Sequence, residues 1–102
     1  KIGDNCDIST NVTIVSGTHI LDPEGIRMAG TGIGQDISIG NGVWVGASSI
    51  IMPGVTLGDK SVVAAGSIVN KNVAPLTIVA GNPARPIKEY NKYTKLWEKC
   101  AK

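Results

Sequence analysis

The only histidine of this 102-residue chain, His19, is the first side chain that could do acid–base chemistry. An imidazole can take up or release a proton near neutral pH. His19 stands directly before a segment rich in turn-forming residues, and loops on rigid scaffolds are where functional groups tend to lie. The simpler alternative is a surface histidine without a role, and the repeat described next bears on the choice between the two.

Aliphatic residues recur every six positions through most of the chain. A six-residue period fits neither an α-helix nor the simple alternation of a flat sheet. It is typical of a parallel β-helix, in which each hexapeptide supplies one short strand and one corner. The aliphatic set is Ile2, Ile8, Ile14 and Ile20, then Ile33, Ile39, Val45, Ile51, Leu57, Val63 and Val69, and the residues four positions later are mostly small or aliphatic.

The repeat is interrupted once, because thirteen residues separate Ile20 from Ile33. We expect an all-β fold, with a parallel β-helix over residues 1–82 and a loop protruding at about residues 21–32. For residues 83–102 we expect an amphipathic α-helix covering the open end of the coil, where backbone groups would otherwise be unpaired. The apolar positions with helical spacing are Ile87, Tyr90, Thr94, Trp97 and Ala101.

Three hexapeptides make one turn of a triangular coil, so residues eighteen apart should be stacked. If seven residues are looped out, Trp44 lies one turn above His19, whereas looping out thirteen places Ile50 there. The first register brings the single histidine and an outward-facing tryptophan to one edge. Ala47 and Ala65 then form a column of small side chains that leaves the backbone open to a ligand. The alternative is that alanine simply fits a tight corner.

Charge and composition limit the classes of partner. The net charge of +2 is too small to indicate nucleic acid, and no apolar run is long enough to span a bilayer. The two cysteines have no metal-ligand spacing, so we expect no metal site and a cytoplasmic protein with reduced thiols. From Asn70 onward there are seven basic and two acidic residues. Among them Lys71, Arg85 and Lys88 are either solvated surface charges or contacts for a ligand with phosphates.

Three runs of sequence resemble the hexapeptide-repeat acyltransferases, and in particular their sugar O-acetyltransferase branch. The first run extends from Ile39 to Asp59 and the second, Val-Ala-Ala-Gly-Ser-Ile-Val, begins at Val63. The third begins at Ile78 and ends in Ala-Gly-Asn-Pro-Ala-Arg, with Arg85 as its last residue. The resemblance covers nearly the whole chain.

This resemblance implies a left-handed β-helix, a homotrimer, and acetyl-CoA bound in the groove between subunits. The expected reaction moves an acetyl group to a hydroxyl of a sugar or saccharide-like acceptor. His19 would be the general base, and one imidazole with one backbone amide would be sufficient for it. The other expected contacts are Trp44, Ala47, Ala65, Lys71, Arg85 and Lys88 for the donor, and Asp22 and Arg27 for the acceptor.

Two other classes of function share the expected fold. A zinc hydratase of the γ-carbonic-anhydrase kind takes several histidines, and this chain has one. A catalytically inactive or truncated β-helix could serve as a scaffold, although that role leaves Trp44 and the alanine column without an explanation. The thin aliphatic core favours an assembly over a lone subunit in either case.

Overall fold

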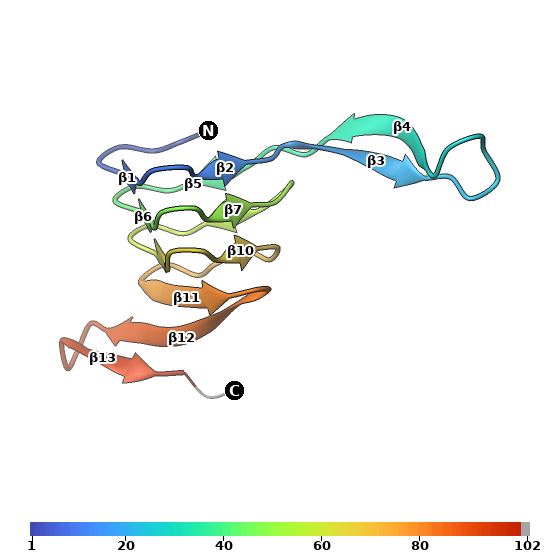
Figure 1. Ribbon diagram of the computed structural model, residues 1–102. Helices are drawn as coiled ribbons and strands as arrows, with labels where there is room; N and C mark the ends of the chain where they lie inside the picture. Colours follow the sequence, from blue (N-terminus) through green and yellow to red (C-terminus); the bar gives the residue numbers. More distant parts are fainter. Residues whose placement is uncertain (101–102) are drawn as a thin grey trace.

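In the computed structural model, which describes residues 1–100, the chain forms a parallel β-helix with a protruding arm and a C-terminal hairpin (Figure 1). Each strand of the coil is two residues long, because the chain turns a corner after every hexapeptide. The coil strands are β1 (Asp7–Ile8), β2 (Thr13–Ile14), β5 (Ser38–Ile39), β6 (Trp44–Val45), β7 (Ile50–Ile51), β8 (Thr56–Leu57), β9 (Val62–Val63) and β10 (Ile68–Val69). The predicted β-helix is confirmed.

The coil has three faces, each a stack of parallel strands. The first face contains β1, β6, β9 and then β11 (Thr77–Gly81), the second contains β2, β7 and β10, and the third contains β5 and β8. Trp44 pairs with Val62, eighteen residues later, and Ile50 pairs in the same way with Ile68. The eighteen-residue turn predicted from the repeat is therefore correct here, whereas the last turn contains sixteen residues, because Ile78 pairs with Val62.

Both inward-pointing sets of the repeat are buried from Ile37 onward, whereas Ile2, Ile8 and Ile14 of the first turn are exposed at the open end of the coil. The side chains of Val45, Ile51, Leu57 and Val63 are completely inaccessible to solvent. The residues four positions later point inward too, and they include the serines Ser49, Ser61 and Ser67. Because the coil is narrow, its axis is filled by branched aliphatic side chains and by these small polar ones.

The corners between the faces follow one backbone rule. We name corner A (residues 3–5, 40–42, 58–60 and 74–76), corner B (9–11, 46–48 and 64–66) and corner C (52–54 and 70–72). Successive turns place a residue with positive φ at the same point of a corner, where the chain must reverse tightly. At corner A these residues are Asn5, Gly42, Lys60 and Leu76, and at corner B they are Asn11, Ser48 and Gly66.

The interruption of the repeat is a β-hairpin rather than a loop. Strands β3 (Gly17–Leu21) and β4 (Ala29–Gly34) pair antiparallel, and Gln35 N donates to Ser16 O where the coil closes again. We call residues 17–34 the arm. It is longer than the expected loop of about residues 21–32, and it contains Ile20 and Ile33, which we had placed in the repeat.

Both predicted registers for His19 are wrong as a consequence. Trp44 pairs with Asp7, which lies 37 positions earlier in the sequence. One turn of the coil, as between Trp44 and Val62, accounts for 18 of them, so the insertion adds 19 residues. His19 lies inside this insertion, where it pairs with Gly32 of β4. The sequence count failed because Ile20 and Ile33 keep the aliphatic phase of the coil while belonging to the arm.

The arm projects from the coil without packing on it (Figure 1). The radius of gyration is 15.3 Å, against about 13 Å for a compact domain of 100 residues. Large apolar side chains of the arm are exposed to solvent, among them Leu21, Ile26 and Met28. An arm that exposes such residues has the character of a contact surface for another molecule.

The expected C-terminal α-helix is not formed in the described part of the chain, which is a second correction. Strand β12 (Ala84–Asn91) pairs antiparallel with β11, and β13 (Leu96–Lys99) pairs with β12. The open edge of β11 needs hydrogen-bond partners, and a strand supplies them where a helix cannot. Tyr90 lies opposite Trp97 in this hairpin, so the apolar spacing also fits two facing strands. Up to residue 100 we find no helix able to cross a bilayer.

The buried serines provide a matched test of the core. Ser49 Oγ donates to Ala64 O at 3.0 Å, whereas Ser61 Oγ has no hydrogen-bond partner within residues 1–100. We expect Ser61→Ala to raise the free energy of unfolding by about 1–3 kcal/mol, because an unsatisfied hydroxyl is removed. Ser49→Ala should lower it by about 0.5–1.5 kcal/mol. Urea unfolding at one fixed protein concentration measures both. Equal losses in the two variants would contradict this account.

Candidate active site

His19 is held by a hydrogen bond within the arm. Its Nδ1 lies 2.9 Å from the backbone oxygen of Gly30 on β4. A carbonyl oxygen can only accept, so this contact requires the proton to be on Nδ1. The other nitrogen, Nε2, is then unprotonated and able to accept a proton from a ligand. This is the tautomer that a general base needs.

The two acceptor candidates lie on the same arm as this histidine and share Gly30 with it. Asp22 and Arg27 line a shallow hollow of about 280 Å³ near the tip of the arm, together with Gly30. Asp22 N donates to Met28 O at 2.8 Å, which closes the turn. A carboxylate and a guanidinium therefore border the segment whose carbonyl orients His19. The arm thus brings together three of the residues predicted from the sequence.

The predicted alanine column is present at corner B. Ala47 follows β6 and Ala65 follows β9, and Gly66 N donates to Ala47 O at 2.8 Å. Both alanines are exposed. Their N–H groups donate no hydrogen bond to any atom of residues 1–100. The column therefore offers free backbone donors to a ligand lying along the corner.

A comparison with corner A explains why these amides are free. At corner A, Asp4 N donates to Asn41 Oδ1 and Asn41 N donates to Asp59 Oδ1, both at 2.8 Å. Each amide is satisfied there by a side chain from the next turn. At corner B the next turn supplies only the methyl groups of Ala47 and Ala65, which cannot accept.

Sequence reasoning missed this distinction, although the residue types contain it. The eighteen-residue spacing assigns Asn41 and Asp59 to one corner, and Ala47 and Ala65 to the corresponding point of the next. Side chains that can accept a hydrogen bond, along one corner, predict backbone N–H groups with a partner. Methyl groups, along the other corner, predict N–H groups without one. We had treated the alanines only as small side chains that leave space.

The outward-facing residues divide the three faces into two kinds. Trp44, Val62 and Ile78 form an exposed or half-buried row on the first face, and Ile50 and Ile68 form one on the second. The third face has Ser38 and Thr56 at the equivalent points. Corner B lies between the two apolar faces, so the open amides are flanked by surfaces that favour burial.

The basic candidates do not form one cluster. Arg85 pairs with Ala80 and Lys88 with Ile78, so both lie on β12 beyond the C-terminal end of the first face. Lys71 lies at corner C, after β10. The side chain of Arg85 donates to Ala84 O at 3.0 Å, which holds it near the backbone.

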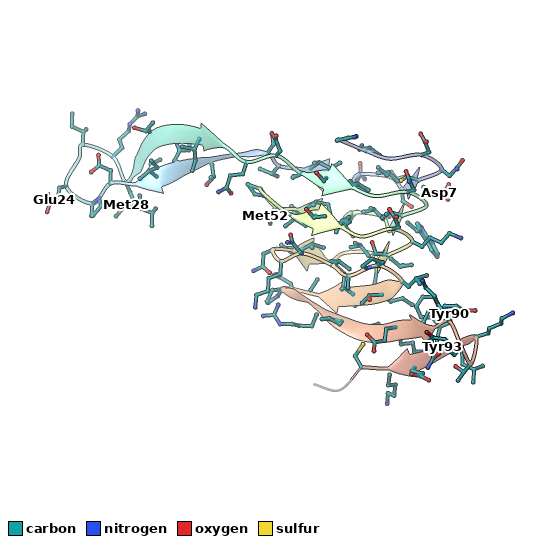
Figure 2. The ribbon with its side chains drawn as sticks, turned by 180° about the vertical axis from the view of Figure 1, so that it is seen from behind. Asp7, Glu24, Met28, Met52, Tyr90 and Tyr93 are labelled. Atoms are coloured by element: carbon teal, nitrogen blue, oxygen red, sulfur yellow. The ribbon has the colours of Figure 1, made fainter. Side chains whose placement is uncertain are left out.

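His19 and Trp44 are far apart within one chain. The arm extends from one side of the coil, and β6, which contains Trp44, lies on the other (Figure 1). Figure 2 shows the same separation from behind, with Glu24 and Met28 at the arm tip and Asp7, which pairs with Trp44, at the opposite side. The expected neighbours His19 and Trp44 are not brought together by a single subunit. Nor does any group of three or more potential metal-ligating side chains occur within residues 1–100.

The comparisons with known proteins agree with the repeat. The family described as "Hexapeptide repeat of succinyl-transferase" matches residues 36–71. Galactoside O-acetyltransferase of Escherichia coli K12 is 47% identical over 90 residues, which are 88% of this chain and 44% of that protein.

Two solved structures have the same fold. A maltose O-acetyltransferase from Clostridium difficile 630 has a TM-score of 0.80 and 39% identity, over 90% of this chain and 49% of that one. A galactoside acetyltransferase in complex with coenzyme A has a TM-score of 0.81 and 46% identity, over 92% and 46%. The chain therefore spans about half the length of these relatives.

These findings confirm the resemblance to the hexapeptide-repeat acyltransferases, and with it the left-handed parallel β-helix. Within that family the similarity is to the sugar O-acetyltransferase branch, as predicted from the sequence.

The orientation of His19 gives a direct test of the arm. Because this is the only histidine, nitrogen-15 NMR of the ring needs no assignment. We expect the neutral ring to carry its proton on Nδ1, because the Gly30 carbonyl accepts it. A neutral ring protonated on Nε2 would contradict the contact and remove the predicted base. The variant Thr18→Ala, one residue away on β3, should leave the tautomer unchanged.

Proposed function

We propose that this chain carries the donor site and the general base of an acetyl-CoA-dependent O-acetyltransferase. The observation that supports it most strongly is the column of open amides at corner B, in a fold whose relatives include a galactoside acetyltransferase solved with coenzyme A. The pantetheine arm of CoA is a chain of amides, and free N–H groups on a rigid corner suit its carbonyl oxygens. Arg85 and Lys88 then lie beyond the column, where phosphates would be reached, and Lys71 contributes from corner C.

In the proposed reaction two groups of the protein act on the transferred acetyl. Nε2 of His19 accepts the proton of the acceptor hydroxyl as its oxygen attacks the thioester carbon. The N–H of Ala47 donates to the carbonyl oxygen as that atom gains negative charge. His19 then returns the proton to the departing sulfur. Protons balance, and no covalent link to the protein is required.

The two groups must come from different subunits, because one chain keeps them apart. We propose a homotrimer in which the arm of one subunit reaches the corner B of its neighbour. The apolar rows on the first and second faces, including Trp44, would be covered by this contact. The exposed apolar residues of the arm would be covered by it as well. Each site then combines His19 of one subunit with Ala47 of another.

The acceptor is proposed to be a hydroxyl of a sugar or saccharide-like molecule, in line with the relatives named for galactosides and maltose. It would occupy the hollow beside His19, where Asp22 accepts from hydroxyl groups and Arg27 donates to oxygen atoms. We place the reaction in the cytoplasm, the compartment expected from the sequence and one that supplies acetyl-CoA. An inactive scaffold is the competing function, and the experiments below separate the two.

A single substitution can supply the free N–H group of Ala47 with a hydrogen-bond acceptor. Asn41 and Gly42 at corner A have the same arrangement as Ala65 and Gly66 at corner B, with glycine at positive φ. Ala65→Asn should therefore let its side chain accept from Ala47 N, as Asn41 does from Asp4. We expect the Kd for acetyl-CoA to rise at least roughly threefold, because a ligand loses that donor and the space beside it. Calorimetric titration measures it.

The matched control is Asp59→Ala, which opens the amide of Asn41 at corner A. It should leave the affinity for acetyl-CoA unchanged. Unaltered affinity in Ala65→Asn, with its fold intact by circular dichroism, would show that corner B does not hold the donor.

The base and the subunit arrangement are tested together. His19→Ala should lower turnover about 10²–10⁴-fold, because the acceptor proton loses its base. The affinity for acetyl-CoA should stay the same, since His19 contacts the acceptor. Thr18→Ala is the control that alters the arm without touching the base. Near-normal turnover in His19→Ala would contradict the assignment.

Ala65→Asn should lower turnover as well, because its side chain occupies the Ala47 N–H that the acetyl oxygen needs, so mixing it with His19→Ala tests the trimer. Subunits with His19→Ala and subunits with Ala65→Asn, unfolded and refolded together, can form sites with both an intact base and an intact corner. We expect partial recovery of turnover, and sedimentation at about three times the 10.6 kDa chain mass. A sum of the separate activities, or a monomer that retains turnover, would show that one subunit holds the whole site.

A further inference from the structure

Most aromatic residues of this protein lie outside the buried core of the coil. Three of the four, Tyr90, Tyr93 and Trp97, lie on the C-terminal hairpin. In Figure 2, Tyr90 and Tyr93 lie on the same side of the coil as Asp7, away from the arm tip at Glu24 and Met28. His19, Asp22 and Arg27, assigned above to base and acceptor, belong to the arm and not to this side, whereas Trp44 pairs with Asp7 here.

A groove of about 890 Å³ runs along corner A and ends at this hairpin. Its volume lies in the range of about 300–1,000 Å³ that small-molecule sites commonly have. The side chains relevant to binding are those of Asn41, Asp59, Lys60, Leu76, Tyr90 and Lys92. The groove therefore combines amide, carboxylate, ammonium and aromatic groups along one edge of the coil.

The walls of the groove are held by backbone hydrogen bonds from turn to turn. Lys60 N donates to Asn41 O, Leu76 N donates to Asp59 O, and Tyr90 N donates to Leu76 O, at 2.8–3.0 Å. The ladder of corner A thus continues without a gap into β12. Tyr90 is positioned by the coil itself, so a ligand would meet a preformed surface.

The polar groups of the groove keep free hydrogen-bonding capacity. Asn41 and Asp59 each use one oxygen to accept a backbone N–H. The amide NH₂ of Asn41 and the second carboxylate oxygen of Asp59 make no hydrogen bond within the described residues. A planar amide and a planar carboxylate, one turn apart, can donate to and accept from neighbouring hydroxyl groups. Lys60 and Lys92 are exposed and add donors on either side.

The apolar part of the groove is an aromatic wall. Tyr90 is half-buried and packs on Trp97 with ring centroids 5.3 Å apart and planes tilted by 58°. Leu76 lies beside it, held at a φ of 56° that is unusual for this residue type. A flat ring next to amide and carboxylate groups is suited to a pyranose, which has one face of C–H bonds and a rim of hydroxyls.

We propose that this groove binds a saccharide chain, as a docking site separate from the acceptor hollow. It would bind one segment of a polysaccharide while another segment of the same polysaccharide is acetylated at the arm of a subunit. Binding itself depends only on corner A and the hairpin. Its link to catalysis rests on the proposed function, so the two are measured separately.

Binding is measured by calorimetry and by amide chemical-shift changes, with maltoheptaose as a neutral probe and an oligomer of sialic acid as an acidic one. We expect at least one of the two saccharides to change the backbone amide chemical shifts of Tyr90, Lys60 and Lys92. Tyr90→Ala should weaken binding roughly 2- to 12-fold, as expected for the loss of a stacked ring. Tyr93→Ala is the matched control, because Tyr93 belongs to the same hairpin and does not line the groove. It should bind as the unaltered protein does.

A second variant distinguishes the loss of a binding contact from a change in the structure of the hairpin, which Tyr90→Ala could also cause. Lys92→Ala leaves the contact of Tyr90 with Trp97 intact, and it should weaken the acidic probe more than Lys95→Ala does. No binding of either probe, or equal losses in groove and control variants, would overturn the docking site. Where acetylation is detected, Tyr90→Ala should raise KM for a long acceptor and leave KM for a monosaccharide unchanged. If a saccharide binds at corner A and no acetylation is detected, the proposed function would be refuted and the docking site would stand.

Discussion

The structure depends on one constraint, the register of backbone hydrogen bonds between successive turns. Val45 and Val63 stack at a spacing of eighteen residues, and the last turn, in which Val63 pairs with Val79, contains sixteen and keeps the same side chains inward. A shift by one residue would turn the aliphatic set outward and the outward set into the axis. An insertion that does not preserve this alternation must therefore leave the coil. The arm satisfies this rule, because it leaves at Ser16 and returns at Gln35, where one hydrogen bond closes the turn.

The same register gives each corner its chemistry. Because corner residues are stacked from turn to turn, a side chain in one turn is placed beside the amide of the turn before. Asn41 and Asp59 accept from those amides, whereas Ala47 and Ala65 leave them without a partner. Two methyl groups thus convert a structural corner into a candidate binding surface without altering the fold. Unsatisfied backbone donors are costly when buried, so this corner needs either water or a ligand.

Much of the fold could be predicted from the sequence, because the repeat and the coil have the same period. The inward residues, the eighteen-residue turn and the alanine column were obtained by counting alone. The arm could not be delimited in this way, since Ile20 and Ile33 mimic the coil while lying in the arm. The C-terminal hairpin was mistaken for a helix because Tyr90 and Trp97 are seven residues apart, which suits either two helical turns or two facing strands. The open edge of β11, which the sequence does not display, decides between them.

The candidate site was predicted as a set of residues but not as an arrangement. His19 and Trp44 were expected on one edge of one chain, and the arm separates them instead. That separation has a physical consequence. The arm has no core of its own and exposes large apolar residues, so its position relative to any corner B must come from contact with another molecule. If His19 is the base, as we propose, it would act only after assembly. Trimer formation would therefore be a condition of catalysis, and the stability of the coil would be independent of it.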